Sequence, residues 1–97
     1  MNRKQLFILL KKYHSEEFDL VQKKNRDYAS DKDPFANFQM FGELGFLVRL
    51  SDKLMRLKQI FERGEISVTD ESVKDTLMDL SNYANLLMAY RESKLKK

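Results

Sequence analysis

The chain has no cysteine, one proline and only three glycines among its 97 residues, and it has no long apolar run. The absence of cysteine excludes a disulfide framework, a thiolate nucleophile and a zinc–thiolate site. No apolar segment approaches the ~20 residues that a membrane-spanning helix requires. The N-terminal stretch also returns to charged residues too soon for a secretory signal. These absences predict a cytoplasmic protein with no membrane partner.

The net charge of +3 is concentrated at the C-terminus of the chain. The residues that produce it stand against a single acid, Glu92, and they are Arg91, Lys94, Lys96 and Lys97. Residues 1–90 are therefore neutral overall, and the sequence predicts a basic tail over residues 93–97. A charged tail of this kind is usually solvated, so we do not expect nucleic acid as a partner.

The length of the chain predicts a single small domain over residues 1–92. A chain of this size buries only roughly 60 to 65% of its unfolded surface, so assembly into a homo-oligomer is the first structural expectation. Apolar residues recur at helical spacing in three long segments. The predicted fold is all-α, a compact bundle of three main helices.

The first predicted helix covers about residues 2–27, with Leu6, Leu10 and Val21 on one face. Glu17 and Lys24 interrupt this face at positions where a purely structural helix places apolar side chains. Two interpretations are open. Lys24 extends its ammonium group outward beyond the buried zone, or both residues face a polar cavity.

A connection of about a dozen residues follows the first helix, and loops of this length often carry function. It contains the only proline, Pro34, which restricts Asp33 to extended conformations, so the first helix must end before it. Phe35 and Phe38 come directly afterwards. They either fill the core from outside or stack on a planar ligand, and filling the core is the commoner use.

The second and third predicted helices cover about residues 41–63 and 70–92. Their core-facing stripes recur at steps of three and four residues. These stripes are Leu47, Leu50, Leu54, Leu57 and Phe61 in the second helix, and Val73, Leu77, Leu80, Ala84 and Leu87 in the third. Gly64 is expected to end the second helix in a left-handed cap, and Thr69 is the expected N-cap of the third.

Three cations, Arg49, Lys53 and Arg56, share one face of the second predicted helix. The arginine fork matches the oxygens of a phosphate group, which makes this face a candidate phosphate site. The alternative is a solvated surface on which aspartates pair with these cations at little energetic gain. We favour the phosphate site because acidic and basic clusters occur together on these helices.

Two carboxylates and an amide follow one side of the third predicted helix, at Asp75, Asp79 and Asn82. A spacing of four residues places Asp75 and Asp79 on the same side. Mg²⁺ takes hard oxygen ligands, usually one or two carboxylates together with substrate phosphates. With Glu17 from the first helix, these two aspartates form a candidate magnesium site, although soluble helices also carry such pairs by chance.

Three segments carry a resemblance to known proteins, namely KKNRDYASDKDPFANF, GFLVRLSDKLMRL and DESVKDTLMDLSNYANLL. Together they resemble the small phage and bacterial proteins called nucleotide modification associated domain proteins of the first type. The segment DTLMDLSNYA is also similar to the third-helix signature of the MazG and dimeric dUTPase group of all-helical nucleotide pyrophosphohydrolases. That similarity implies a helical oligomer that binds nucleoside triphosphates through magnesium, with Asp79 at the signature aspartate. Thr76 stands where the signature has a glutamate, which favours binding without hydrolysis.

The residues and the resemblance together lead to one expected function, the binding of a nucleotide or another phosphorylated nucleoside-like ligand. In a phage-type protein, such binding would sequester a nucleotide signal of host defence. The expected ligand-binding residues are Lys24, Asn25, Tyr28, Phe35, Arg49, Lys53, Arg56 and Asn82. The first alternative is a magnesium-dependent nucleoside triphosphate pyrophosphohydrolase with Glu17, Asp75 and Asp79 as metal ligands. The second is a helical adaptor that binds another protein.

Overall fold

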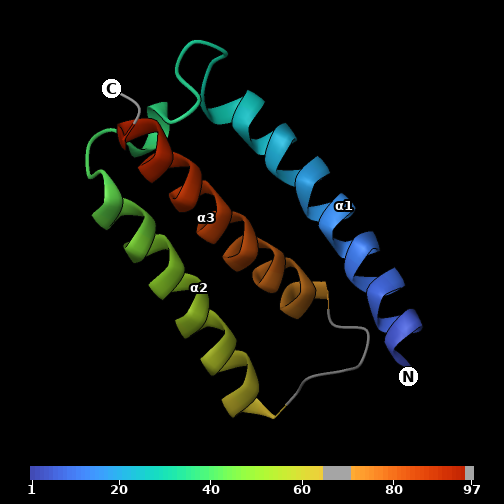
Figure 1. Cartoon of the computed structure of the whole chain (residues 1–97). Coiled ribbons are helices and arrows are strands. Elements are labelled where there is room, and N and C mark those ends of the chain that lie inside the picture. The colour runs from blue at the N-terminus through green and yellow to red at the C-terminus, as the bar shows by residue number, and fades with distance from the viewer. Residues whose placement is uncertain (65–70, 96–97) are drawn as a thin grey trace. The chain divides into compact units, whose positions relative to one another are not determined.

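The computed structural model of the chain describes residues 1–64 and 71–95. Its elements are α1 (Arg3–Tyr28), the short 3-10 helix η1 (Ala36–Phe38), α2 (Glu43–Arg63) and α3 (Glu71–Leu95), as Figure 1 shows. No strand occurs in the described residues. The predicted all-α class and the three main helices are thus confirmed. Within the same residues, no helix combines the length and the apolar composition of a membrane span.

The chain divides into two compact units, residues 1–36 and residues 37–97, and each is described by itself. The single domain over residues 1–92 stays a prediction. The first unit contains α1 and most of the connection that follows it. The second unit contains α2 and α3.

In the first unit, α1 is fixed at both ends by side-chain hydrogen bonds. At its start, Asn2 and Gln5 form a capping box in which each side chain accepts the other's backbone N–H at 2.8 Å. This arrangement satisfies two backbone donors that a helix start otherwise leaves free. At its end, the Asn25 Nδ2 group donates to the carbonyl oxygen of Pro34 at 2.7 Å. The connection is therefore tied back to the last turn of α1.

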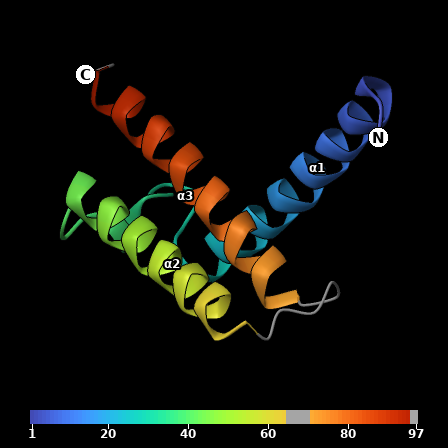
Figure 2. The ribbon, with the colours of Figure 1, turned by 90° about the horizontal axis from the view of Figure 1, so that it is seen from below.

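In the second unit, α2 and α3 lie side by side and run in opposite directions (Figures 1 and 2). An ion pair of 3.0 Å between Glu43 Oε1 and Arg91 Nε joins the start of α2 to the end of α3. Gly64 ends α2 with a φ of 67°, which confirms the predicted left-handed cap. The predicted N-cap of α3, Thr69, lies outside the described residues.

Two helix ends differ slightly from the prediction. The second helix begins at Glu43 rather than near Phe41, because Gly42 adopts a φ of 56° that a right-handed helix does not allow. The third helix continues to Leu95 rather than ending near Glu92. The sequence after Glu92 contains neither glycine nor proline to stop it earlier.

The core of the second unit is aromatic. Phe46 is completely buried, and its ring stacks on that of Phe38 with 4.0 Å between the centroids. Tyr90 lies against the same ring at 5.3 Å, and Phe38 meets Tyr83 edge-on at 6.3 Å. Phe38 thus fills the core, the commoner of the two uses that the sequence left open. The aromatic rings connect the segment before α2 to the C-terminal half of α3.

The buried stripe of α2 is only partly the predicted one, since Leu57 is buried and Leu50 half-buried as expected. Phe46 and Leu57 are buried, while Leu47, Leu54 and Phe61 are exposed. The difference corresponds to a rotation of the helix by about one residue, because apolar side chains surround most of α2 and its periodicity alone does not select the buried part.

The third helix differs from its predicted stripe in the same way. Leu77 and Ala84 are exposed, whereas Thr76 and Tyr90 are buried. The two predicted stripes therefore contribute an exposed surface as well as part of the core.

Candidate functional site

The candidate site centres on an ion pair between α2 and α3. Lys53 Nζ lies 3.1 Å from Asp79 Oδ2, and the two side chains are 27% and 12% exposed. This pair is better shielded from water than an ordinary surface pair, whose contribution is about 0 to 1 kcal/mol. It fixes which side chains of the two helices stand opposite one another.

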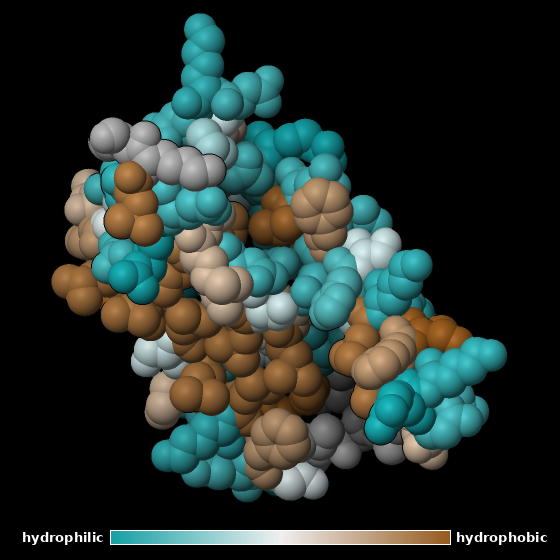
Figure 3. All heavy atoms as spheres, in the orientation of Figure 1, coloured by the Kyte–Doolittle hydropathy of each residue, from teal (hydrophilic) through white to brown (hydrophobic). Residues whose placement is uncertain are grey.

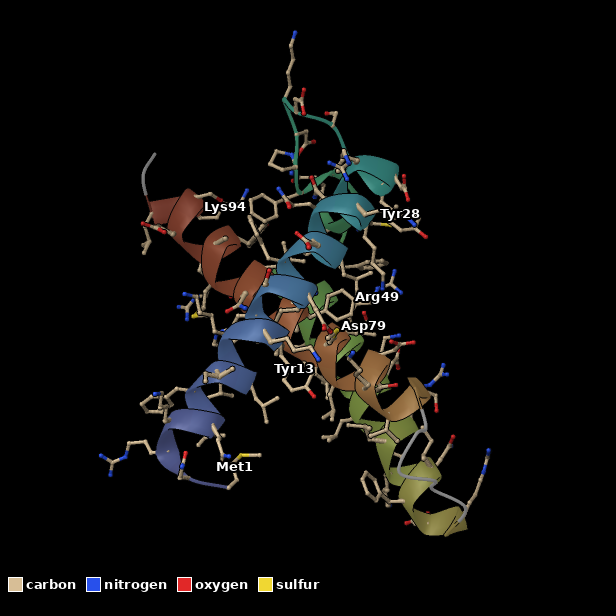
Figure 4. All side chains as sticks on the ribbon, turned by 90° about the vertical axis from the view of Figure 1, so that its right-hand side faces the viewer. Met1, Tyr13, Tyr28, Arg49, Asp79 and Lys94 are labelled. Atoms are coloured by element: carbon tan, nitrogen blue, oxygen red, sulfur yellow. The ribbon has the colours of Figure 1, made fainter. Side chains whose placement is uncertain are left out.

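The positions of the other predicted polar residues follow from the number of residues that separate them from Lys53 on α2 or from Asp79 on α3. Arg49 precedes Lys53 by one turn and Arg56 follows it by nearly one turn, so the three cations lie along the same side of α2. Asp75 and Asn82 flank Asp79 on α3 in the same way. Because the helices are antiparallel, Arg49 is level with Asn82 and Arg56 with Asp75. Figure 4 labels Arg49 and Asp79 on their helices.

We call this set the polar face of the helix pair. Its members are Arg49, Lys53 and Arg56 of α2 together with Asp75, Asp79 and Asn82 of α3. The structure thus shows one contact within this set, between Lys53 and Asp79, and the other four residues follow the same sides of their helices. All of them belong to the second unit.

The members of the polar face differ in exposure. Arg49, Arg56 and Asp75 are exposed, so their charged groups reach solvent, whereas Asn82 is only 8% exposed. In the described part of the chain, no buried side-chain nitrogen or oxygen lacks a hydrogen-bond partner. The face therefore combines exposed charged groups with a buried amide.

A neighbouring polar residue, Thr76, has a structural use that sequence reasoning missed. It is 2% exposed, and its hydroxyl donates to the backbone carbonyl of Ser72 at 2.6 Å. This bond lies within one turn of α3 and satisfies the hydroxyl locally. Its residue type could have indicated this burial, because threonine is one of the few polar residues that can be buried in a helix without a distant partner.

The remaining predicted site residues belong to the first unit. Glu17, Lys24, Asn25 and Tyr28 lie on α1, and Phe35 lies in the connection after it. Lys24 and Tyr28 are exposed, while Asn25 and Phe35 are half-buried. Asn25 already has a local task, since its amide nitrogen ties down the connection at Pro34. The polar face is therefore built without these five residues.

Across the described residues, no group of three or more histidine, aspartate or glutamate side chains is arranged to hold a metal ion. Asp79 instead contacts the ammonium group of Lys53. A divalent cation at Asp79 would have to displace that group or approach the carboxylate from its other side.

Comparison with protein-family models, curated proteins and solved structures finds no match to this chain.

Proposed function

We propose that this protein binds a nucleotide or another phosphorylated nucleoside-like ligand at the polar face of α2 and α3. The observation that carries the proposal is the Lys53–Asp79 pair with an exposed arginine one turn to either side. Asp79 offsets the charge of Lys53, so Arg49 and Arg56 supply the positive charge that an anion would meet. The two arginines are seven positions apart, or roughly 10 Å along the helix axis.

The chemistry of these side chains fits phosphate better than a carboxylate ligand of one charge. Each guanidinium can donate two parallel hydrogen bonds to phosphate oxygens. Two arginines at this separation can each contact a different phosphate group. Lys53, between them, adds a third donor if a bound phosphate draws it partly away from Asp79.

The rest of a nucleotide needs hydrogen-bonding groups and a flat apolar surface. Asp79 and Asn82 offer a carboxylate and an amide that suit ribose hydroxyls and base edges. Tyr28 and Phe35, which belong to the first unit, stay sequence-based candidates for stacking on the base. Lys24 and Asn25 of the same unit likewise stay candidates from the sequence.

The resemblance to phage and bacterial proteins extends the proposal to a biological role. A homo-oligomer that binds a nucleotide without converting it would lower the free concentration of that nucleotide. In a phage-type protein this would sequester a signal of host defence.

Magnesium-dependent hydrolysis ranks second. Asp75 and Asp79 share one side of α3, as a metal site requires, but the ammonium of Lys53 occupies the position next to Asp79. Product analysis separates the two functions. Nucleotides should be recovered intact after incubation with the protein and magnesium if binding alone occurs.

The test of the binding site is calorimetric titration after a thermal-shift screen of linear and cyclic nucleotides, with and without magnesium. Replacing Arg56 by glutamine removes a charge-assisted contact of about 1.5 to 3 kcal/mol. Affinity should therefore fall by roughly ten- to a hundredfold. Arg3→Gln is the matched control, because it removes the same charge from an exposed position at the start of α1. Equal affinities for both variants and the unaltered protein would exclude Arg56 from the site.

A further inference from the structure

The helix pair has a second exposed surface, on the side opposite the polar face. Residues two apart on a helix point about 160° away from one another. Leu47 and Leu54 stand two positions before Arg49 and Arg56, and Leu77 stands two positions after Asp75. Ala84 stands in the same relation to Asn82. We call this surface the apolar face, and its members are Leu47, Leu54 and Phe61 of α2 with Leu77, Ala84 and Met88 of α3.

The apolar face is comparable in area to the largest apolar patch of a typical monomer. Its five large side chains each expose between 51% and 63% of their surface. At roughly 150 to 200 Å² for a whole large side chain, they contribute roughly 430 to 570 Å² of apolar area. The largest apolar patch of a typical monomer is about 300 to 600 Å² and is often functional. Figure 3 shows apolar atoms gathered over α2 and α3.

The line of residues along this side of α3 has an internal symmetry. It is composed of Lys74, Leu77, Ser81, Ala84, Met88 and Glu92. Counted inward from its two ends, the line pairs Lys74 with Glu92, Leu77 with Met88, and Ser81 with Ala84. The midpoint of each pair falls between positions 82 and 83 or on position 83.

We infer that α3 pairs antiparallel with α3 of a second copy of the chain, about a twofold axis near position 83. A twofold axis brings the same patch of both copies together, so each contact occurs twice. Lys74 then lies opposite Glu92 of the second copy, and Leu77 opposite Met88. The small side chains of Ser81 and Ala84 meet at the axis, where they allow the two helices to approach closely.

Charge and area both favour a second copy as the occupant. The six residues that define the apolar face are uncharged, and the charged residues beside them, Lys58 and Arg91, are already paired with Glu62 and Glu43 of the same chain, so two copies can bury the face without an unpaired charge. The line of α3 ends in opposite charges, which become complementary only when the helix is reversed. Since homodimer interfaces are about 65% apolar, the apolar area predicts roughly 700 Å² per copy, close to the ~800 Å² of a standard interface.

Single cysteines provide a direct test, because the chain has none of its own. Ala84→Cys chains should be joined in high yield by a short thiol-reactive crosslinker. Ala89→Cys is the matched control, since Ala89 is exposed on the same helix but points about 140° away. Sedimentation should show a dimer or larger for the unaltered chain and a monomer for Leu77→Asp, with helical content unchanged. Equal crosslinking at both positions, or an unaltered chain that is monomeric, would overturn the pairing.

A charge exchange tests the antiparallel register. Both Lys74 and Glu92 also interact within their own chain, so single changes alone are not diagnostic. Lys74→Glu should weaken the dimer by roughly tenfold, because like charges then face one another at two places. Lys74→Glu combined with Glu92→Lys should restore the dimer. The two residues are roughly 27 Å apart along one helix, so this rescue requires a second copy.

The inference specifies the oligomer of the proposed function, and its failure can be told apart from a failure of nucleotide binding. If nucleotide binds but the double charge exchange gives no rescue, the α3 pairing is wrong and the binding proposal stands. If the dimer forms as described but no nucleotide binds, only the binding proposal fails.

Discussion

Replacement of Phe46 by alanine is the strongest test of the core. Its side chain is completely buried, stacks on Phe38 at 4.0 Å between centroids and contacts Tyr90 at 5.3 Å. A buried phenylalanine replaced by alanine costs about 3 to 5 kcal/mol through lost burial and the cavity left behind. The value should lie in the upper half of that range, because each aromatic pair adds about 0.5 to 1.5 kcal/mol beyond area burial.

This cost is large compared with the total stability of the protein. A chain of this size has a free energy of unfolding of about 5 to 15 kcal/mol, so Phe46→Ala should remove about a quarter of it or more. With an m-value of about 1 to 1.5 kcal/mol/M, the midpoint of urea unfolding should fall by at least about 2 M. Helical circular dichroism follows the transition. Phe46→Leu retains much of the apolar volume and should cost about 1 to 3 kcal/mol, which keeps the test usable if the alanine variant does not fold.

Phe41→Ala is the matched control, because Phe41 is 68% exposed and lies only five positions away. It should change the free energy of unfolding by no more than about 0.5 kcal/mol. Similar losses for the two alanine variants would refute the aromatic core around Phe46.

Two further changes test the ends of the helices. Asn2→Ala removes the capping box of α1, so it should cost about 0.5 to 2 kcal/mol and speed amide exchange in the first turn, while Asn85→Ala on the exposed side of α3 should cost nothing. Gly64→Ala forces a φ of 67° on a residue with a Cβ, and thermal unfolding should report a loss of about 1 to 2 kcal/mol. Nothing lies within 4 Å of the added Cβ, so a backbone cost alone is expected, and Gly64→Asn should lose less because asparagine tolerates this conformation. A loss from Gly64→Asn equal to that from Gly64→Ala would contradict this explanation.

The elements of the fold could be predicted because their signals are local. Proline at position 34 and glycine at position 64 fix the ends of two helices through backbone conformations that depend on few neighbours. The capping box was also readable, since Asn2 is followed three residues later by Gln5, but it was not identified from the sequence.

The buried side of each helix could not be predicted, because it depends on a contact between distant segments. The predicted stripe contains Leu47 and Leu54, whereas the buried side of α2 contains Phe46 and the half-buried Lys53 in their place. A lysine is rarely buried without a partner. The ion pair of Lys53 with Asp79, 26 positions further along the chain, is what makes partial burial of a lysine acceptable.

The residues of the polar face could be predicted from side-chain spacing. Which residue of α2 lies opposite which residue of α3 could not. The sequence placed Arg49, Lys53 and Arg56 on one side of α2, and Asp75, Asp79 and Asn82 on one side of α3. Which cation stands opposite which acid follows only from the antiparallel pairing and the 3.1 Å contact between Lys53 and Asp79.

The error in the predicted stripes has a consequence for both proposals. Arg49, Lys53 and Arg56 share one side of α2, where their charges together raise the local positive potential, whereas the Lys58–Glu62 pair lies on another side of the helix. The surplus apolar side chains must lie on the opposite side, where they require cover. Ligand binding at the polar face and pairing through the apolar face therefore use opposite sides of the same two helices. Neither blocks the other, and each copy of a dimer would keep its own cations open to an anion.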